Sequence, residues 1–141
     1  MSDKIEGGCL CGAVRFEAKA APLWVANCHC SMCRRAHGAA YVTWVSVPAQ
    51  SFMITRGLHN VKDFESSPSA LRSFCQRCGS TMFFRAKRWK DEVHIARANI
   101  DPPFDAKPQV HAFFSDRADW LDLHDELPKR GGPTGIEPLE E

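Results

Sequence analysis

The 141-residue sequence has no long apolar run, no internal repeat and no excess of charge of one sign. No stretch approaches the roughly 20 apolar residues that cross a bilayer. The start MSDKIEGG has neither the basic nor the apolar part of a signal peptide. We therefore expect a cytoplasmic protein without a membrane partner. A net charge of +1 and small basic clusters such as those at 34–35 and 87–90 argue against nucleic acid as a partner.

Helical signals are also few, whereas short runs rich in Val, Phe, Thr and Trp recur between Pro, Gly, Ser and Asp, as strands do. These runs are AVRFEA (13–18), AAYVTWVSV (39–47), SFMIT (51–55), NVKDF (60–64), LRSFC (71–75), TMFFRA (81–86), VHIARA (93–98) and VHAFF (110–114). A helical turn is expected at 31–37 after an N-cap Ser31, and 115–127 fits a helix or an extended segment. The sequence predicts a mainly β single domain over 1–128 and a flexible tail, rich in Pro and Gly, over 129–141.

Seven cysteines stand out against this background. A reducing compartment and an odd number argue against a disulfide framework, so metal ligation is the better interpretation. CLCG supplies Cys9 and Cys11, and CQRCG supplies Cys75 and Cys78. Each pair is followed by a glycine, and four thiolates complete a tetrahedral structural zinc site. A redox dithiol is the alternative, but no βαβ unit accompanies the CxxC pair; isolated core cysteines are another.

The remaining three cysteines, Cys28, Cys30 and Cys33, lie within six residues and can bind a second zinc ion. Catalytic zinc sites have three protein ligands and a fourth position for water or substrate. We therefore favour an open, reactive site. The rival interpretation is that His37 supplies a fourth ligand and makes this site structural too. His29, between two proposed ligands, is expected to point away from the metal.

The ordered motifs CLCG, CHCSMCRRAHG and SSPSALRSFCQRCGSTMFF resemble the glutathione-dependent formaldehyde-activating enzyme family, which includes the centromere protein V-like proteins. The resemblance extends from about Gly7 to about Pro128. It implies a β-tent fold, in which layered antiparallel sheets are held together by zinc. It also implies two zinc ions: a structural ion on Cys9, Cys11, Cys75 and Cys78, and a catalytic ion on Cys28, Cys30 and Cys33.

The activity that the resemblance implies is the making or breaking of a carbon–sulfur bond, as in a carbon–sulfur lyase. The partner is a small thiol adduct such as S-hydroxymethylglutathione, formed from glutathione and formaldehyde. A zinc ion with an open position suits this chemistry, because it binds a thiol sulfur as the thiolate. The alternative is a zinc-stabilised binding module without catalysis, but a purely structural protein with two zinc ions is expected to supply eight ligands rather than seven.

Residues around the cysteines allow functional and structural interpretations. Arg34 and Arg35 suit a substrate carboxylate but fit a solvated turn equally well, and Arg72 lies either near the metal region or on a strand surface. Packing is expected for Trp44, Phe52, His111 and Trp120. A solvated acidic surface is expected for Asp122, Asp125 and Glu126.

Overall fold

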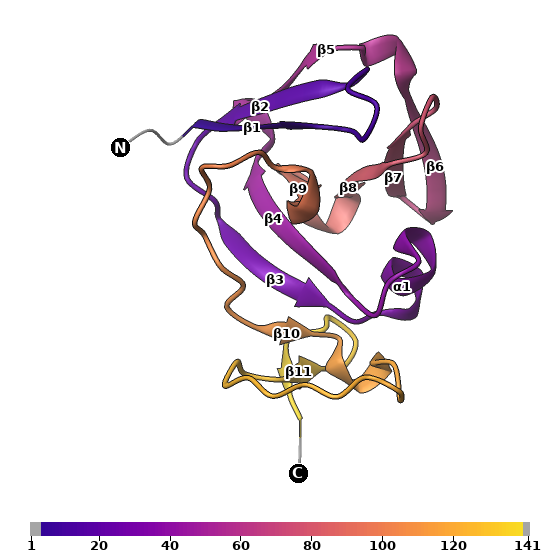
Figure 1. Cartoon of the computed structure of the whole chain (residues 1–141). Helices are drawn as coiled ribbons and strands as arrows, with labels where there is room; N and C mark the ends of the chain where they lie inside the picture. Colours follow the sequence, from indigo (N-terminus) through magenta and orange to yellow (C-terminus); the bar gives the residue numbers. More distant parts are fainter. Residues whose placement is uncertain (1–3, 140–141) are drawn as a thin grey trace. The chain divides into compact units, whose positions relative to one another are not determined.

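The computed structural model describes residues 4–139 and divides the chain into two compact units. The first unit contains the chain up to Leu23 together with Val45–Ala106. The second unit contains Trp24–Trp44 together with the chain from Lys107 onward (Figure 1). Each unit is therefore built from two separate stretches of sequence. Within the described residues, no helix is long and apolar enough to cross a membrane.

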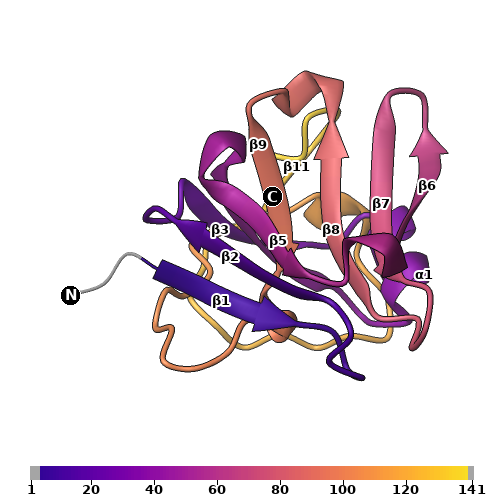
Figure 2. The same cartoon turned by 90° about the horizontal axis from the view of Figure 1, so that it is seen from above.

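The first unit consists of two groups of antiparallel strands. A three-stranded sheet in the order β1-β2-β5 contains β1 (Lys4–Gly8), β2 (Arg15–Lys19) and β5 (Phe52–Arg56). A second group in the order β9-β8-β7-β6 contains β6 (Val61–Ser67), β7 (Ala70–Cys75), β8 (Thr81–Ala86) and β9 (Glu92–Ala96). Figure 2 shows β6, β7 and β8 side by side. Short 3-10 helices precede or follow several of these strands: η1 (Ala49–Ser51), η2 (Leu58–Asn60), η3 (Lys87–Trp89) and η4 (Arg97–Asn99).

An aromatic cluster forms part of the core of the first unit. In β2 the alternation of side chains buries Phe16, whose ring lies 5.2 Å from that of Phe83 in β8 and 6.0 Å from that of Phe52 in β5. The rings of Phe52 and Phe83 are 4.9 Å apart and nearly perpendicular. Burial of one such side chain contributes about 1.5–3 kcal/mol, so these three rings are a substantial reason for β2, β5 and β8 to pack together.

The second unit combines short strands with one helix. It contains β3 (Trp24–Cys28), α1 (Ser31–His37), β10 (His111–Ala112), η5 (Phe114–Asp116), β11 (Arg130–Gly131) and β12 (Glu137–Pro138). A further strand, β4 (Val42–Pro48), begins in this unit and continues into the first. β10 pairs in parallel with β3, which places His111 opposite Asn27 and Ala112 opposite Cys28. This pairing joins β3, which ends at the first of the three clustered cysteines, to a strand more than eighty positions later in the sequence.

The mainly β prediction with antiparallel sheets is confirmed, and every predicted strand run overlaps a strand of the structure. β1, β3, β11 and β12 were not predicted, and the parallel β10–β3 pair departs from the antiparallel expectation. The predicted N-cap Ser31 is wrong: Cys30 is the N-cap, because its Sγ accepts the backbone N–H of Cys33 at 3.3 Å. The region 115–127 is not helical beyond the turn of η5.

The predicted tail also contains regular structure. Its residues 130–138 carry the antiparallel pair β11–β12, and Phe113 donates its backbone N–H to the carbonyl of Gly135 at 2.9 Å. Residues 140 and 141 of that segment lie outside the described residues. The domain limit at residue 128 stays a prediction.

Candidate metal centres

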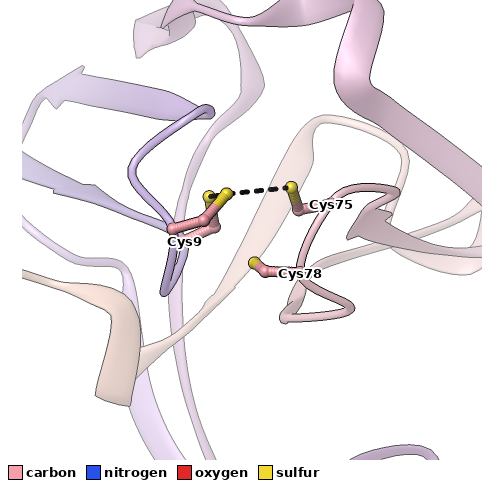
Figure 3. A group of neighbouring side chains, drawn as sticks. Cys9, Cys75 and Cys78 are labelled. Carbon is pink, nitrogen blue, oxygen red and sulfur yellow. Dashed lines mark hydrogen bonds between the residues drawn. The ribbon is translucent and has the colours of Figure 1, made fainter.

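Four cysteines of the first unit converge from two loops. Cys9 and Cys11 follow β1, and Cys75 and Cys78 lie at the end of β7 and in the turn after it. Their sulfur atoms all lie within 4.8 Å of one another, and Figure 3 shows the side chains of Cys9, Cys75 and Cys78 directed toward a common centre. The Cys9–Cys11 sulfur distance is 3.7 Å and the Cys11–Cys75 distance is 3.9 Å. Sulfurs about 2.3 Å from a tetrahedral zinc ion lie roughly 3.8 Å apart, so this donor set fits zinc.

Hydrogen-bond donors surround this four-cysteine group. The backbone N–H of Val14 donates to Sγ of Cys9 at 3.3 Å. The hydroxyl of Ser80 lies 3.2 Å from Sγ of Cys78 and accepts the backbone N–H of Leu10. Donation by Ser80 stabilises the thiolate and lowers the pKa of Cys78 to about 5. Part of the group is therefore prepared for the thiolate form that metal binding requires.

A glycine closes the turn that carries Cys75 and Cys78. Gly79 has a φ of +80°, a left-handed conformation that costs other residues strain, and its N–H donates to the carbonyl of Cys75 at 2.8 Å. This turn directs both thiols to the same side of the chain. The local sequence CQRCG therefore forms the geometry that its spacing predicts.

The three remaining cysteines come together in the second unit and are called the triad below. Cys28 ends β3, Cys30 caps α1 and Cys33 lies in its first turn, so one strand–helix junction brings all three sulfurs within 4.8 Å of one another. Cys28 and Cys33 are buried and Cys30 is half-buried. Within residues 4–139, no His, Asp, Glu or further Cys joins this group.

The electrostatics of the triad favour a bound cation. Contacts with Cys30 and Cys33, together with burial, raise the pKa of the Cys28 thiol far above its usual value. Three thiolates cannot form so close together unless a positive charge compensates them. The donor set is that of a soft-ligand site for a divalent ion, which fits the zinc expected here.

An indole ring gives the triad an additional hydrogen bond. Trp44 is buried, as packing predicts, and its Nε1–H donates to Sγ of Cys33 at 3.4 Å. The ring of His37 packs edge-on against Trp44, with 5.2 Å between ring centroids. His37 is not among the residues whose ligand atoms cluster with the triad, and this arrangement supports the interpretation with three protein ligands.

His29 lies outside the triad, as expected from its place between two ligands. Its Nε2 is 2.8 Å from Nδ1 of His111, and Nε2 of His111 is 2.9 Å from Oδ2 of Asp125. Both imidazole rings are fully buried. The His111 hydrogen bond lowers the pKa of the Asp125 carboxyl, which also accepts the backbone N–H of Leu127. Asp125 is exposed, in agreement with the predicted solvated acidic surface, but its carboxylate also pairs with a buried histidine, which that prediction did not include.

The other residues named from the sequence have different surroundings. Arg34 donates to the backbone carbonyls of His29 and Asp116, at 3.4 and 3.1 Å. These hydrogen bonds stabilise the loop that carries the triad. Arg35 is exposed. Arg72 is buried in the first unit with its guanidinium 5.0 Å from the centre of the Phe84 ring, not on a strand surface. The packing expected of Trp120 is wrong, because its side chain is 70% exposed.

Sequence reasoning missed two partners of the triad region, the indole donor of Trp44 and the chain from His29 to Asp125. Neither has a local spacing that points to it: Trp44 follows Cys33 by 11 positions, and Asp125 follows His111 by 14. The sequence offered one indication of the His111–Asp125 hydrogen bond, which is that a histidine and several carboxylates occur in the same C-terminal segment. It did not distinguish Asp125 from its acidic neighbours.

Comparison with known proteins identifies the family that this chain matches. The sequence profile of the glutathione-dependent formaldehyde-activating enzymes matches residues 4–116. A protein of Halomonas elongata that carries this family's name is 31% identical over an alignment of 127 positions, which covers 84% of this chain and 80% of that protein. An uncharacterized lyase of Schizosaccharomyces pombe is 33% identical over an alignment of 95 positions, which covers 64% of each chain.

A solved structure shares the fold. The crystal structure of a Rhodobacter sphaeroides protein matches with a TM-score of 0.60 and 24% sequence identity, covering 71% of this chain and 91% of that one. At this identity the match shows the fold alone.

Proposed function

The chain belongs to the glutathione-dependent formaldehyde-activating enzyme family, and from this premise we propose that it is a carbon–sulfur lyase or synthase acting on a thiol–aldehyde adduct. The proposed substrate class is represented by S-hydroxymethylglutathione. In the synthetic direction the thiol sulfur attacks the aldehyde carbon and the carbonyl electron pair moves to oxygen. The thiol proton is lost and the new oxygen gains one, so the product is a hydroxymethyl thioether without any change in oxidation state overall.

The observation that carries this proposal is a group of three sulfur ligands without a fourth protein ligand among the described residues. Cys28, Cys30 and Cys33 would hold a zinc ion there, and Cys9, Cys11, Cys75 and Cys78 would hold a second, structural one. A zinc ion bound at the triad would coordinate the substrate sulfur and favour its thiolate form. Three cysteinate ligands give that ion a soft character, which suits sulfur better than water.

The residues of the chain prepare this site in three ways. Helix α1 fixes Cys30 and Cys33 in adjacent positions, because the cap hydrogen bond ties them together. Trp44 donates to Sγ of Cys33 and so disperses part of its negative charge. Arg34 donates hydrogen bonds to two backbone carbonyls around the triad, so its guanidinium is already engaged. Arg35, which is exposed on α1, is therefore the candidate residue to bind a substrate carboxylate.

The test measures exchange of ¹³C-formaldehyde between its hydrate and glutathione by magnetisation-transfer NMR. Wild-type protein is expected to accelerate the exchange, and Cys30→Ser to abolish the acceleration while retaining one metal ion per chain. Met32→Ser, at a half-exposed position in the same helix, is the matched control and is expected to behave as wild type. A panel of other thiols and aldehydes then defines the substrate.

Two results would contradict the proposal. Full activity of Cys30→Ser would remove the triad from the chemistry. Two bound zinc ions without acceleration for any thiol–aldehyde pair would favour the binding module instead.

A further inference from the structure

Asp125, His111 and His29 form a continuous hydrogen-bonded chain that ends at the triad loop. Asp125 is 39% exposed, whereas both histidines are fully buried. The two connecting distances, 2.9 Å from Asp125 Oδ2 to His111 Nε2 and 2.8 Å from His111 Nδ1 to His29 Nε2, are those of good hydrogen bonds. The chain therefore leads from the surface of the second unit to the backbone that joins Cys28 and Cys30.

The chemistry of the three groups gives the hydrogen bonds a direction. An ionised carboxylate only accepts, so His111 donates through Nε2–H. A neutral His111 then accepts at Nδ1, and His29 must donate through Nε2–H. This tautomer leaves Nδ1 of His29 without a proton, in agreement with the lack of a hydrogen-bond partner for that atom among the described residues. A buried acceptor without a partner is less unfavourable than a buried N–H donor without one.

Ring packing fixes His29 from other directions. Its ring lies 4.9 Å from that of Tyr41 and 5.1 Å from that of Phe114, with the Phe114 contact nearly perpendicular. The hydrogen bond to His111 then selects one orientation of the ring within this apolar enclosure. An apolar residue of similar size would fill the same space without the cost of burying a polar group. The histidine pair therefore needs an explanation other than packing.

The backbone of His29 is held as firmly as its side chain. Its N–H donates to the carbonyl of Ala112 at 3.0 Å, and its carbonyl accepts from Nε of Arg34 at 3.4 Å. The peptide groups on either side of His29 carry Cys28 and Cys30. Any rotation of the His29 backbone would consequently move both sulfurs.

We propose that Asp125, His111 and His29 are positioning residues, which hold the Cys28–Cys30 loop in its metal-binding geometry before a metal ion arrives. The inference rests on the proposed function only in taking the triad as a metal site. None of the three side chains is a ligand; they act through the loop. Loss of the carboxylate at the far end of the chain should therefore weaken metal binding at a site it does not touch.

The test compares Asp125→Ala with Asp122→Ala. Asp122 lies in the same segment and pairs with a histidine in the same way, its Oδ2 lying 3.0 Å from Nε2 of His124, but both side chains are more than 80% exposed. Metal-free protein is titrated with Co²⁺, and the sulfur-to-cobalt charge-transfer and d–d bands are recorded; zinc affinity is measured by competition with a chelator. The four-cysteine group provides an internal reference within each variant.

Asp125→Ala is expected to weaken metal binding at the triad by about 10–100-fold and to change its cobalt spectrum. Binding at the four-cysteine group should not change, and Asp122→Ala should match wild type at both sites. Asp125→Asn retains an oxygen that can accept from His111, so it should recover most of the lost affinity. Equal titrations for Asp125→Ala and Asp122→Ala would overturn the proposal.

Two features keep the test decisive. Because Asp125 is partly exposed, water can occupy the space that Ala leaves; should Asp125→Ala nevertheless not fold, Asp125→Ser replaces it in the same comparison. The readout is metal affinity and spectrum, so it remains interpretable if wild-type protein shows no thiol–aldehyde activity. Failure of the proposed function and failure of this inference are thus separate results.

Discussion

The indole Nε1–H of Trp44 donates to Sγ of Cys33 across 3.4 Å, and both side chains are buried. A hydrogen bond to a thiolate ligand withdraws electron density from sulfur and so adjusts the electrophilic character of a bound metal. It also gives the buried indole N–H an acceptor, which buried Trp side chains usually find.

The first prediction concerns this hydrogen bond. Trp44→Phe is expected to shift the charge-transfer band of the cobalt-loaded triad to lower energy, because the Cys33 thiolate becomes more electron-rich. The smaller ring should also reduce the free energy of unfolding by about 1–3 kcal/mol. Absorption spectra and denaturant unfolding measure the two effects. Trp120→Phe, at a 70% exposed position, is the control, and an unchanged spectrum of Trp44→Phe would contradict the prediction.

The second prediction concerns the four-cysteine group. Cys75→Ser is expected to lose one zinc ion and several kcal/mol of stability, because a structural zinc site contributes about 10–16 kcal/mol of apparent binding energy. Metal analysis and thermal unfolding measure these losses. Cys30→Ser should lose the other ion with a smaller decrease in unfolding temperature. The assignment of roles would be reversed if Cys30→Ser were the less stable of the two.

The third prediction concerns pH. Burial lowers the pKa of His94 below its usual 6.5, although the hydrogen bond that its Nε2–H donates to Glu92 at 2.9 Å opposes this shift. Below pH 6.5 the unfolded chain therefore binds a proton that the folded protein does not, and stability falls as the pH decreases. One such proton gives a slope of at most about 1.4 kcal/mol per pH unit.

Unfolding free energies between pH 6.5 and 5 measure this slope in wild type and in His94→Gln. The variant is expected to have the shallower slope, whatever its absolute stability. His124→Gln, at an 81% exposed histidine side chain, should retain the wild-type slope. Parallel slopes for wild type and His94→Gln would exclude His94 as the titrating group.

The fourth prediction compares two glycines. At Gly79 an added Cβ has no heavy atom within 4 Å, but the φ of +80° is strained for alanine, so Gly79→Ala should cost about 1 kcal/mol. At Gly7 the added Cβ would overlap the backbone oxygen of Asn99. A backbone neighbour cannot move aside as a side chain can, so Gly7→Ala should be the more destabilising of the two in denaturant unfolding. The opposite order would show that β1 can move away from Asn99.

The grouping of the cysteines could be predicted from the sequence because metal ligands can be counted. Two glycine-closed pairs supply four thiols and leave three, and the structure brings together these same two groups. Strands such as TMFFRA could be predicted because short runs rich in Phe and Thr are typical of strands, although here the buried residues Met82 and Phe83 are consecutive rather than alternating. The roles of the two groups remain predictions.

Other features depend on long-range packing that the sequence does not show. β1 has the sequence KIEGG, and its two glycines have low strand propensity. The segment is nevertheless a strand because it pairs with β2. β10 contains two residues only, too few for a recognisable period, and pairs with a strand far away in sequence. Asp125 and Asp122 are the same residue type three positions apart, and no local pattern specifies that Asp125 pairs with the buried His111 whereas Asp122 pairs with an exposed histidine.

The two cysteine groups differ in the length of chain that each one encloses, and this difference determines the order in which the proposed metal sites are completed during synthesis. Cys11 and Cys75 are separated by 64 positions, whereas Cys28 and Cys33 are separated by only five. Closing the longer loop costs about 2 kcal/mol more in chain entropy. The triad ligands are also complete on a growing chain more than forty residues before Cys78 is added. If the proposed assignment holds, a nascent polypeptide can compete for zinc at the triad while only Cys9 and Cys11 of the four-cysteine group have been synthesised.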